Sequence, residues 1–282
     1  MFKDVLVHLD GSSGDELRLQ HAEMLAAGTS GFLTGILSVP LPDLVTIMPM
    51  DGGAAAAEII ADLDEEARRT GDRIQQNLSE RFLRLSVSNE IRRIEGSPGQ
   101  LARLAASDAR KADLFVLSRP YGGNGAAQST DLFEAVLFES GRGLYVVPPE
   151  RRPPDAIRRV LVAWRDTREA ARALAEAMPF IANATRTEIL VIDAEKDRSS
   201  QKVTPELDVA RHIGRYGTSV EINMRQSGGR PVSEVILEQA HRMPADLIVM
   251  GAYGHSRAHE WMLGGATRDM LEMSNLPMVM AH

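Results

Sequence analysis

Short runs of apolar and β-branched residues alternate along the chain with longer stretches in which apolar residues recur at helical spacing. The short runs are typical of strands buried on both faces of a parallel sheet. In the first half they lie at residues 3–9, 32–39, 113–117 and 144–147. The amphipathic stretches between them predict helices, the longest over residues 54–85. Glu90–Glu95 alternates apolar and charged residues, which predicts an edge strand with one wet face.

The pattern of the first half returns in the second half. Val160 repeats Val5 at an offset of 155 residues, and Asp246 repeats Asp113 at an offset of 133. The difference places about 22 extra residues in the first half, which we assign to residues 41–71. A proline-rich linker divides the halves, so we predict two domains, residues 1–149 and 155–282. The alternation of strands and helices predicts an α/β fold: two tandem doubly wound domains, each a five-stranded parallel sheet with helices on both faces.

Composition narrows the class of protein. The 282 residues are 44% hydrophobic and 25% charged, carry a net charge of −7 and include no cysteine. These values favour a globular protein in a reducing compartment and exclude disulfides and thiolate metal sites. An acidic chain without a basic block lacks the signature of a nucleic-acid partner, and no apolar run reaches the ~20 residues of a membrane helix. The N-terminal residues enter a strand pattern without a signal-peptide core, so we expect a cytoplasmic location.

A glycine-rich loop after the buried run Asp246–Met250 is the strongest candidate for chemistry. Gly251, Gly254 and Gly264 have the spacing G-x2-G-x9-G, and a helical pattern begins at Ala266. Bare main-chain amides at the start of a helix can hold a phosphate. The spacing differs from the dinucleotide fingerprint G-x-G-x-x-G and from the Walker loop G-x4-G-K-[ST], and a plain turn is the alternative interpretation.

Three segments, Gly251–Arg257, Leu263–Thr267 and Asn275–Met280, resemble the C-terminal signature of the universal stress protein family. ATP-binding members of that family carry G-x2-G-x9-G-[ST] before their last helix and strand, and the resemblance extends over both halves as a tandem. It implies a Rossmann-like fold, ATP or another adenine nucleotide as ligand, with or without Mg, and a role in the stress response. Gly265 stands where the signature has Ser or Thr, and Thr267 could supply the hydroxyl.

The resemblance also implies a binding site in the second half. The base pocket would comprise Ala163, Val191 and Met250, with Arg165 or Asp166 at the ribose. The phosphates would lie on the main chain of Gly251, Gly254, His255, Gly264, Gly265 and Ala266, with the Thr267 hydroxyl in support. For Arg165 the alternative is a solvated surface side chain, because most arginines are exposed.

The first half keeps the opposite part of this site. Asp10 matches the family's acidic residue after the first strand, where the second half has Arg165. Ser118, Tyr121 and Thr130 stand at or near the positions of the three glycines. We therefore expect the second half to bind the nucleotide and interpret the first half as a degenerate domain kept for packing.

Other chemistry has less support in the sequence. His255, His259 and Glu260 lack the H-E-x-x-H order of zinc proteases, so we predict no metal site. No catalytic set of Ser, His and Asp emerges. A nucleotide-binding regulator is the first hypothesis. The alternatives are a weak ATP hydrolase that uses Arg165, Asp166 and His255, and a scaffold without a ligand.

The last strand of each half is apolar, at Leu144–Val147 and Met278–Ala281. Exposed apolar edges associate unless they are paired. Because members of the family pair through this strand, we expect the two halves to pair internally through it, and a homodimer of the chain is a further possibility.

Overall fold

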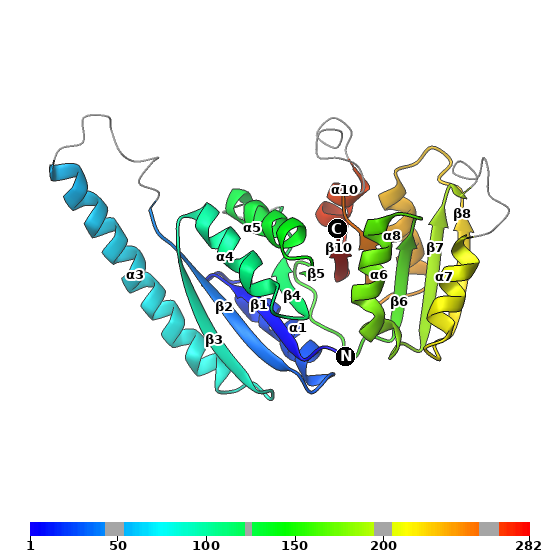
Figure 1. The fold of residues 1–282 in the computed structure, drawn as a ribbon, viewed down its shortest axis with the longest axis horizontal. Helices are drawn as coiled ribbons and strands as arrows, with labels where there is room; N and C mark the ends of the chain where they lie inside the picture. Colours follow the sequence, from blue (N-terminus) through cyan, green and yellow to red (C-terminus); the bar gives the residue numbers. More distant parts are fainter. Residues whose placement is uncertain (43–53, 122–125, 195–204, 254–264) are drawn as a thin grey trace. The chain divides into compact units, whose positions relative to one another are not determined.

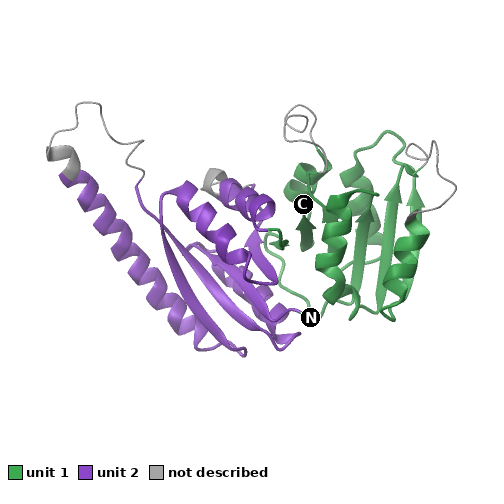
Figure 2. Ribbon diagram, in the orientation of Figure 1, with its two compact units in different colours: residues 1, 141–282 green, residues 2–140 purple. Residues whose placement is uncertain are grey.

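The computed structural model describes residues 1–42, 54–121, 126–194, 205–253 and 265–282. Its contacts divide the chain into two compact units, which are coloured separately in Figure 2. The first unit comprises residues 2–140, and the second comprises residues 141–282 together with Met1. Each unit is described by itself.

The first unit is a parallel sheet flanked by helices (Figure 1). Its strands lie in the order β3-β2-β1-β4, and the β1–β2, β1–β4 and β2–β3 pairs are all parallel. Helices α4 and α5 pack against each other, α1 lies along β1, and α3 contacts β2 and β3. The elements are β1 (Asp4–Leu9), α1 (Asp15–Ala27), β2 (Phe32–Pro40), α3 (Ala54–Phe82), β3 (Asn89–Gly96), α4 (Pro98–Ala109), β4 (Leu114–Ser118) and α5 (Ala126–Glu139).

The second unit repeats this arrangement and adds one antiparallel strand. Its order is β5-β10-β9-β6-β7-β8, in which only the β5–β10 pair is antiparallel. The elements are β5 (Gly143–Val147), β6 (Arg159–Trp164), α6 (Arg168–Ile181), β7 (Arg186–Ile192), α7 (Pro205–Gly214), β8 (Val220–Arg225), α8 (Val232–Arg242), β9 (Leu247–Gly251), α10 (Ala266–Met273) and β10 (Met278–Ala281). The predicted doubly wound α/β architecture is confirmed.

The units divide before β5, whereas the repeat in the sequence places β5 at the end of the first half. Within the second unit, Val146 lies opposite Met278 and Leu144 opposite Met280. Both strands are buried along their length, so the pairing covers two apolar edges. The domain limits 1–149 and 155–282, the internal pairing of whole domains and a homodimer all stay predictions.

The edge prediction for the third strand is confirmed. β3 lies at the end of the order in the first unit, and its residues alternate between partly buried and exposed over the first half of the strand. Central strands such as β1 and β4 are buried almost throughout. The sequence of β3 therefore alternates because one face of this edge strand is exposed to solvent.

An aspartate braces the start of the first strand in each unit. Asp113 Oδ2 accepts hydrogen bonds from the N–H groups of Lys3 (2.6 Å) and Asp4 (3.1 Å). Asp246, which repeats Asp113 in the sequence, accepts from the N–H groups of Arg158 (3.0 Å) and Arg159 (2.9 Å). The duplicated sequence thus reproduces a tertiary hydrogen bond as well as an order of elements.

The extra residues of the first half contribute to a long helix. α3 has 29 residues, whereas the helix at the same place in the second unit, α7, has 10. Ion pairs fix α3 to β3, with Arg68 bound to Glu95 at 2.6 Å. A side chain at Gly71 would lie 2.8 Å from Val39, so glycine allows α3 to approach β2 closely. Residues 43–53 of the predicted insertion lie outside the described residues.

Candidate functional site

The carboxyl ends of three neighbouring strands bring together the predicted base pocket. Ala163 on β6 lies opposite Met250 on β9, and Val191 on β7 lies opposite Trp164, the residue after Ala163. Val191 and Met250 are buried, and Ala163 is partly exposed. β6 is thus flanked by β7 and β9, which is the switch point of strand order where ligands bind in open α/β sheets.

Arg165 and Asp166 form the short connection between β6 and α6, and both are exposed. The turn is fixed by its own main chain, since the Thr167 N–H donates to the Arg165 carbonyl at 2.8 Å. The Thr167 hydroxyl caps α6 by accepting from the Ala170 N–H at 3.3 Å. Both charged side chains therefore start from a rigid base beside the predicted pocket.

Gly251 is required for packing, a function that the sequence did not reveal. A side chain at this position would lie 2.6 Å from the Ala170 nitrogen and 2.7 Å from the Glu169 carbonyl carbon. These are backbone atoms at the start of α6, and they cannot rotate away. The glycine at the end of β9 therefore lets α6 lie against the sheet, whether or not a phosphate is bound.

Thr267 and Gly265 shape the far side of the glycine loop. The Thr267 hydroxyl, predicted to support phosphate, accepts a hydrogen bond from the Tyr253 N–H at 3.2 Å and is buried. Tyr253 has a φ of +54°, which bends the chain sharply after β9. Gly265 is the N-cap of α10 and offers no side-chain cap, so the amides of Ala266 and Thr267 begin the helix without intrahelical acceptors.

Part of the predicted phosphate loop lies outside the described residues. Gly254, His255 and Gly264 fall in the segment 254–264, as do His259 and Glu260. Within the described ranges, no group of three or more His, Cys, Asp or Glu side chains could hold a metal ion. Among the helices described, none is both long and apolar enough to cross a membrane.

A polar cluster that sequence reasoning missed lies beside Gly251. Arg168 pairs with the buried Glu169, and His282 links Arg168 (3.0 Å, Nη2 to Nε2) to the Ala252 carbonyl (3.1 Å, from Nδ1). Burial raises the pKa of Glu169, but hydrogen bonds from Arg168 and the backbone outweigh it, so this pKa lies below its ordinary value. In the sequence Arg168 and Glu169 look like ordinary residues of a first helical turn.

The corresponding place in the first unit is filled by the unit's own side chains. Arg18, which is almost fully buried, donates to Asp10 (2.6 Å), Asp15 (2.5 Å) and Ser12 (3.2 Å). It also reaches Ser118 on β4 (3.3 Å), the residue that replaces Gly251. Asp10 is therefore engaged by a cation of this chain at the position where the family has its nucleotide-facing acid.

Charge and burial set the ionisation of this cluster. Burial raises the pKa of Asp10, but the charge of Arg18 outweighs it and lowers the pKa well below its usual range. Burial raises the pKa of Asp15, although Arg18 opposes the shift. Burial also lowers the pKa of His8 to about 4, so this histidine is neutral at pH 7.

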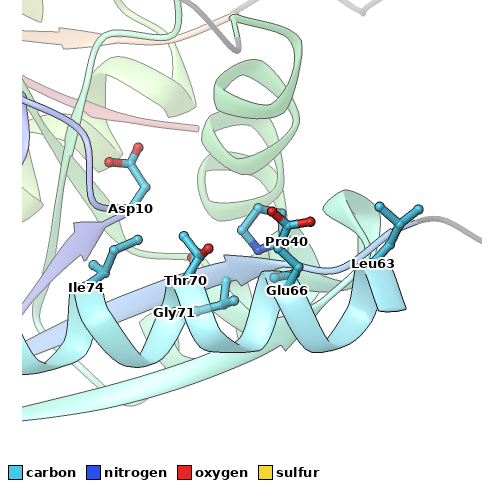
Figure 3. A pocket seen from close by; sticks show the side chains of 10 residues that line it. Asp10, Pro40, Leu63, Glu66, Thr70, Gly71 and Ile74 are labelled. Atoms are coloured by element: carbon cyan, nitrogen blue, oxygen red, sulfur yellow. The ribbon is translucent and has the colours of Figure 1, made fainter. Parts of the chain in front are cut away.

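Helix α3 covers the carboxyl ends of β1 and β2 in the first unit. A side chain at Gly11, which has a φ of +79°, would lie 2.5 Å from the Ile74 side chain. A pocket of about 300 Å³ is left between α3, Asp10 and the end of β2. Figure 3 shows Leu63, Glu66, Thr70 and Ile74 of α3 along one side of this pocket and Pro40 behind it.

The fold and this site define a class of protein: doubly wound α/β units with a glycine-bearing loop between the fourth strand and the last helix of the second unit. Among solved structures, the chain is similar to a universal stress protein from Archaeoglobus fulgidus DSM 4304, with 18% identity, 99% of this chain and 95% of that chain covered, and a TM-score of 0.70. It is also similar to a functionally unknown protein from Pseudomonas aeruginosa PAO1, with 14% identity, 99% and 92% coverage and a TM-score of 0.57. At these identities the likeness shows the fold.

A family model matches the second half of the sequence. The universal stress protein family model matches residues 156–282, which lie in the second unit. Another matching structure is a universal stress protein in complex with cAMP, with 17% identity, 51% of this chain and 94% of that chain covered, and a TM-score of 0.30. No protein with a curated description matches the sequence significantly.

Proposed function

We propose that the second unit binds ATP or another adenine nucleotide and that the chain acts as a nucleotide-dependent regulator in the stress response, in the cytosol. One observation carries the proposal: the carboxyl ends of β7, β6 and β9 are neighbours in the sheet, and the chain runs from the end of β9 to the uncapped start of α10. Gly265 and Ala266 at this helix start are small residues and are partly exposed. Main-chain amides at a helix start favour an anion.

The proposed contacts follow the geometry of this edge. The base would pack against Ala163, Val191 and Met250, and the exposed Arg165 or Asp166 would meet the ribose. The phosphates would accept hydrogen bonds from the amides of Gly265, Ala266 and the loop residues Gly254, His255 and Gly264. Thr267 would act chiefly on the loop, because its hydroxyl already accepts from Tyr253.

Mg would reach this site with the nucleotide. The described residues offer no preformed group of three acidic or histidine ligands, and the exposed Asp166, one of the two proposed ribose contacts, supplies a single carboxylate. Mg²⁺ typically uses one or two carboxylates together with substrate phosphates, so this donor set suits an ion carried by ATP. The Mg would neutralise phosphate charge.

The choice of the second unit is supported by the contrast with the first. There, Arg18 holds Asp10 and reaches Ser118, so the place between the ends of β1 and β4 already contains a guanidinium. The corresponding helix position in the second unit, at the offset of 155, is Ala173, a small buried residue on α6.

The decisive variant is Ala266→Pro in the full chain. Proline is accepted at the first position of a helix and removes only the main-chain N–H, and the extended ψ of 147° at Gly265 suits a following proline. A lost hydrogen bond to a charged group is worth about 1.5–3 kcal/mol, so ATP affinity should fall by at least about tenfold. Ala266→Ser, which keeps the N–H, is the matched control.

Adenosine distinguishes the phosphate contact from the base pocket. Isothermal titration with adenosine should give the same affinity for both variants, because adenosine has no phosphate, whereas ATP and cAMP should bind more weakly to Ala266→Pro. Equal ATP affinity in Ala266→Pro and Ala266→Ser would contradict the proposed phosphate site. If the wild-type chain bound no nucleotide, the alternative hypothesis of a scaffold without a ligand would be favoured.

A further inference from the structure

The strand β8 presents a free edge. It pairs with β7 on one side, and none of the described residues forms a strand on its other side. The Asp193 N–H donates to the Arg225 carbonyl at 2.9 Å, so the main-chain groups of Arg225 point towards β7. Because the main-chain N–H and C=O groups of successive strand residues point alternately to the two sides, those of Val220, Ile222 and Met224 point away from β7. Each of these three residues can therefore pair with a residue of another strand.

The sequence of β8 is complementary to itself in one antiparallel register. When two copies of the strand meet about a two-fold axis at Asn223, Ile222 of each copy lies opposite Met224 of the other copy. These residues have outward main-chain groups, so they can exchange hydrogen bonds in both directions. The same register sets Glu221 opposite Arg225 of the second copy, at a position without hydrogen bonds, where side chains approach most closely.

Both charged side chains are held on the face of β8 that packs against α8. Arg225 donates to Gln239 of α8 at 2.9 Å, and Glu221 lies two strand positions away on either side of the Asn223 centre. Glu221 is 55% exposed and pairs with Arg186 at 2.7 Å. A carboxylate has two oxygens and accepts several hydrogen bonds, so Glu221 can bind Arg225 of a second copy while it keeps Arg186.

The other face of β8 is apolar and is packed against α7 (Figure 1). Met224 on this face is 49% exposed. Asp208 and His212 of α7 face α6, so at about 100° per residue Leu207 and Gly214 lie on the opposite flank of the helix, towards the free edge. Leu207 is 46% exposed, and a Cβ at Gly214 would meet no described atom within 4 Å. This flank therefore leaves room for a second molecule.

The edge strand of the first unit lacks this complementarity. The Leu33 N–H donates to the Ser88 carbonyl at 2.9 Å, so the odd-numbered residues of β3 have the outward main-chain groups. The two registers centred within β3 that pair these groups place Arg92 or Arg93 opposite its own copy. Like charges directly opposite each other are destabilising, and charged residues commonly protect an edge strand from association. Such protection is present at β3 and absent at β8.

We propose that β8 pairs with β8 of a second copy of this chain, antiparallel about a two-fold axis at Asn223. The sheet of the second unit then continues into that of the second molecule, with Glu221 bound to Arg225 across the junction and the α7 helices side by side on one face. This surface is separate from the β5–β10 pairing, and its use does not depend on nucleotide binding.

Sedimentation velocity over a concentration series should show the full chain passing from monomer to dimer. Met224→Lys removes two half-exposed methionines from the junction, so the dissociation constant should rise at least about tenfold. Met224→Leu is the matched control and should associate as the wild type does. Because Met224 is half exposed, both variants should fold, and urea unfolding checks this.

Two charge variants test the register. Glu221→Lys alone and Arg225→Glu alone each place like charges opposite each other, so each should self-associate at least about tenfold more weakly. An equimolar mixture of the two variants restores opposite charges in both pairs and should form heterodimers with nearly wild-type affinity. A mixture that associates no better than either variant alone would contradict the register.

Hydrogen exchange followed by NMR tests the pairing in the wild-type chain. The Ile222 and Met224 amides should exchange more slowly at concentrations where the dimer forms. The proposal is overturned if the wild type stays monomeric, if these two amides exchange equally fast in monomer and dimer, or if Met224→Lys associates as tightly as Met224→Leu.

Discussion

Replacing Arg18 with methionine should destabilise the first unit strongly at neutral pH. The guanidinium is 5% exposed and binds Asp15, which is 10% exposed, and Asp10, which is 34% exposed. Methionine keeps the volume but leaves Asp15 without a counter-charge. Removing one partner of a buried ion pair costs about 3–5 kcal/mol, and because Asp10 can be hydrated we expect about 3 kcal/mol here.

The loss in Arg18→Met should shrink as the pH falls. The pKa of Asp15 is already raised in the folded state, and the loss of Arg18 raises it further. A group with a raised folded-state pKa contributes its stability below the unfolded value, about 3.9 for Asp, and loses it as the pH rises through the folded value. The variant should therefore approach the wild type between pH 7 and about pH 4.

Asp15→Asn in the Arg18→Met background separates charge from packing. The N–H groups of Asp10 (3.1 Å) and Gly11 (2.8 Å) donate to different oxygens of Asp15; asparagine keeps an acceptor for one of them and has no charge to bury. The double variant should recover most of the loss and remove most of its pH dependence. Equal destabilisation of the single and double variants would refute the electrostatic reasoning.

Urea titrations with pulsed hydrogen exchange and mass spectrometry can resolve the two units. Peptides from β1 and β2 report the first unit, and a peptide from β9 serves as the internal control because it belongs to the second unit. The labelling pulse is given at one fixed pH, so that intrinsic exchange rates are the same in every sample. A shift in the β9 peptide equal to that in β1 would show a global effect and would contradict a local one.

Three further predictions concern the second unit. Gly251→Ala should lower its stability by about 1–3 kcal/mol without nucleotide, because the added carbon meets α6 backbone; urea unfolding followed by tryptophan fluorescence measures this. Thr267→Val should speed hydrogen exchange at the Tyr253 amide, and Thr267→Ser should not. Asp246→Asn should cost about 1–2 kcal/mol at pH 7. Because the folded-state pKa of Asp246 is lowered, this difference should vanish in urea titrations as the pH falls below about 4.

The architecture could be predicted from the sequence because the burial of a strand determines its pattern of apolar and polar residues. Strands such as β4 and β9 are covered on both faces, so they are continuous apolar runs, and β3 is at an edge, so it alternates. The placement of Ala163, Val191 and Met250 at one sheet edge also follows from parallel strands. Predicting these features requires only the order of the strands and helices along the chain.

Packing between elements was not predictable in the same way. The need for glycine at position 251 depends on how closely α6 approaches β9, and the Tyr253–Thr267 hydrogen bond depends on where α10 begins. Arg18 did leave a signal: a charged residue interrupts the apolar stripe of α1 at the position that Ala173 occupies in α6. A charge at such a position predicts a buried partner.

Asp15 and Arg18 in the first unit correspond to Ala170 and Ala173 in the second. This difference explains why the carboxyl ends of the strands have different surroundings in the two units. All four residues are buried on the helix that follows the first strand of each unit, at the offset of 155. In the first unit the charged pair fixes Asp10 and reaches Ser118, so the edge between β1 and β4 is closed by a guanidinium. In the second unit alanines stand at these helix positions, and Arg165 and Asp166, which follow β6, are exposed. Because the same helix positions differ between the units, we expect the proposed nucleotide binding at this edge to depend on two side chains of a helix as much as on the glycines of the loop.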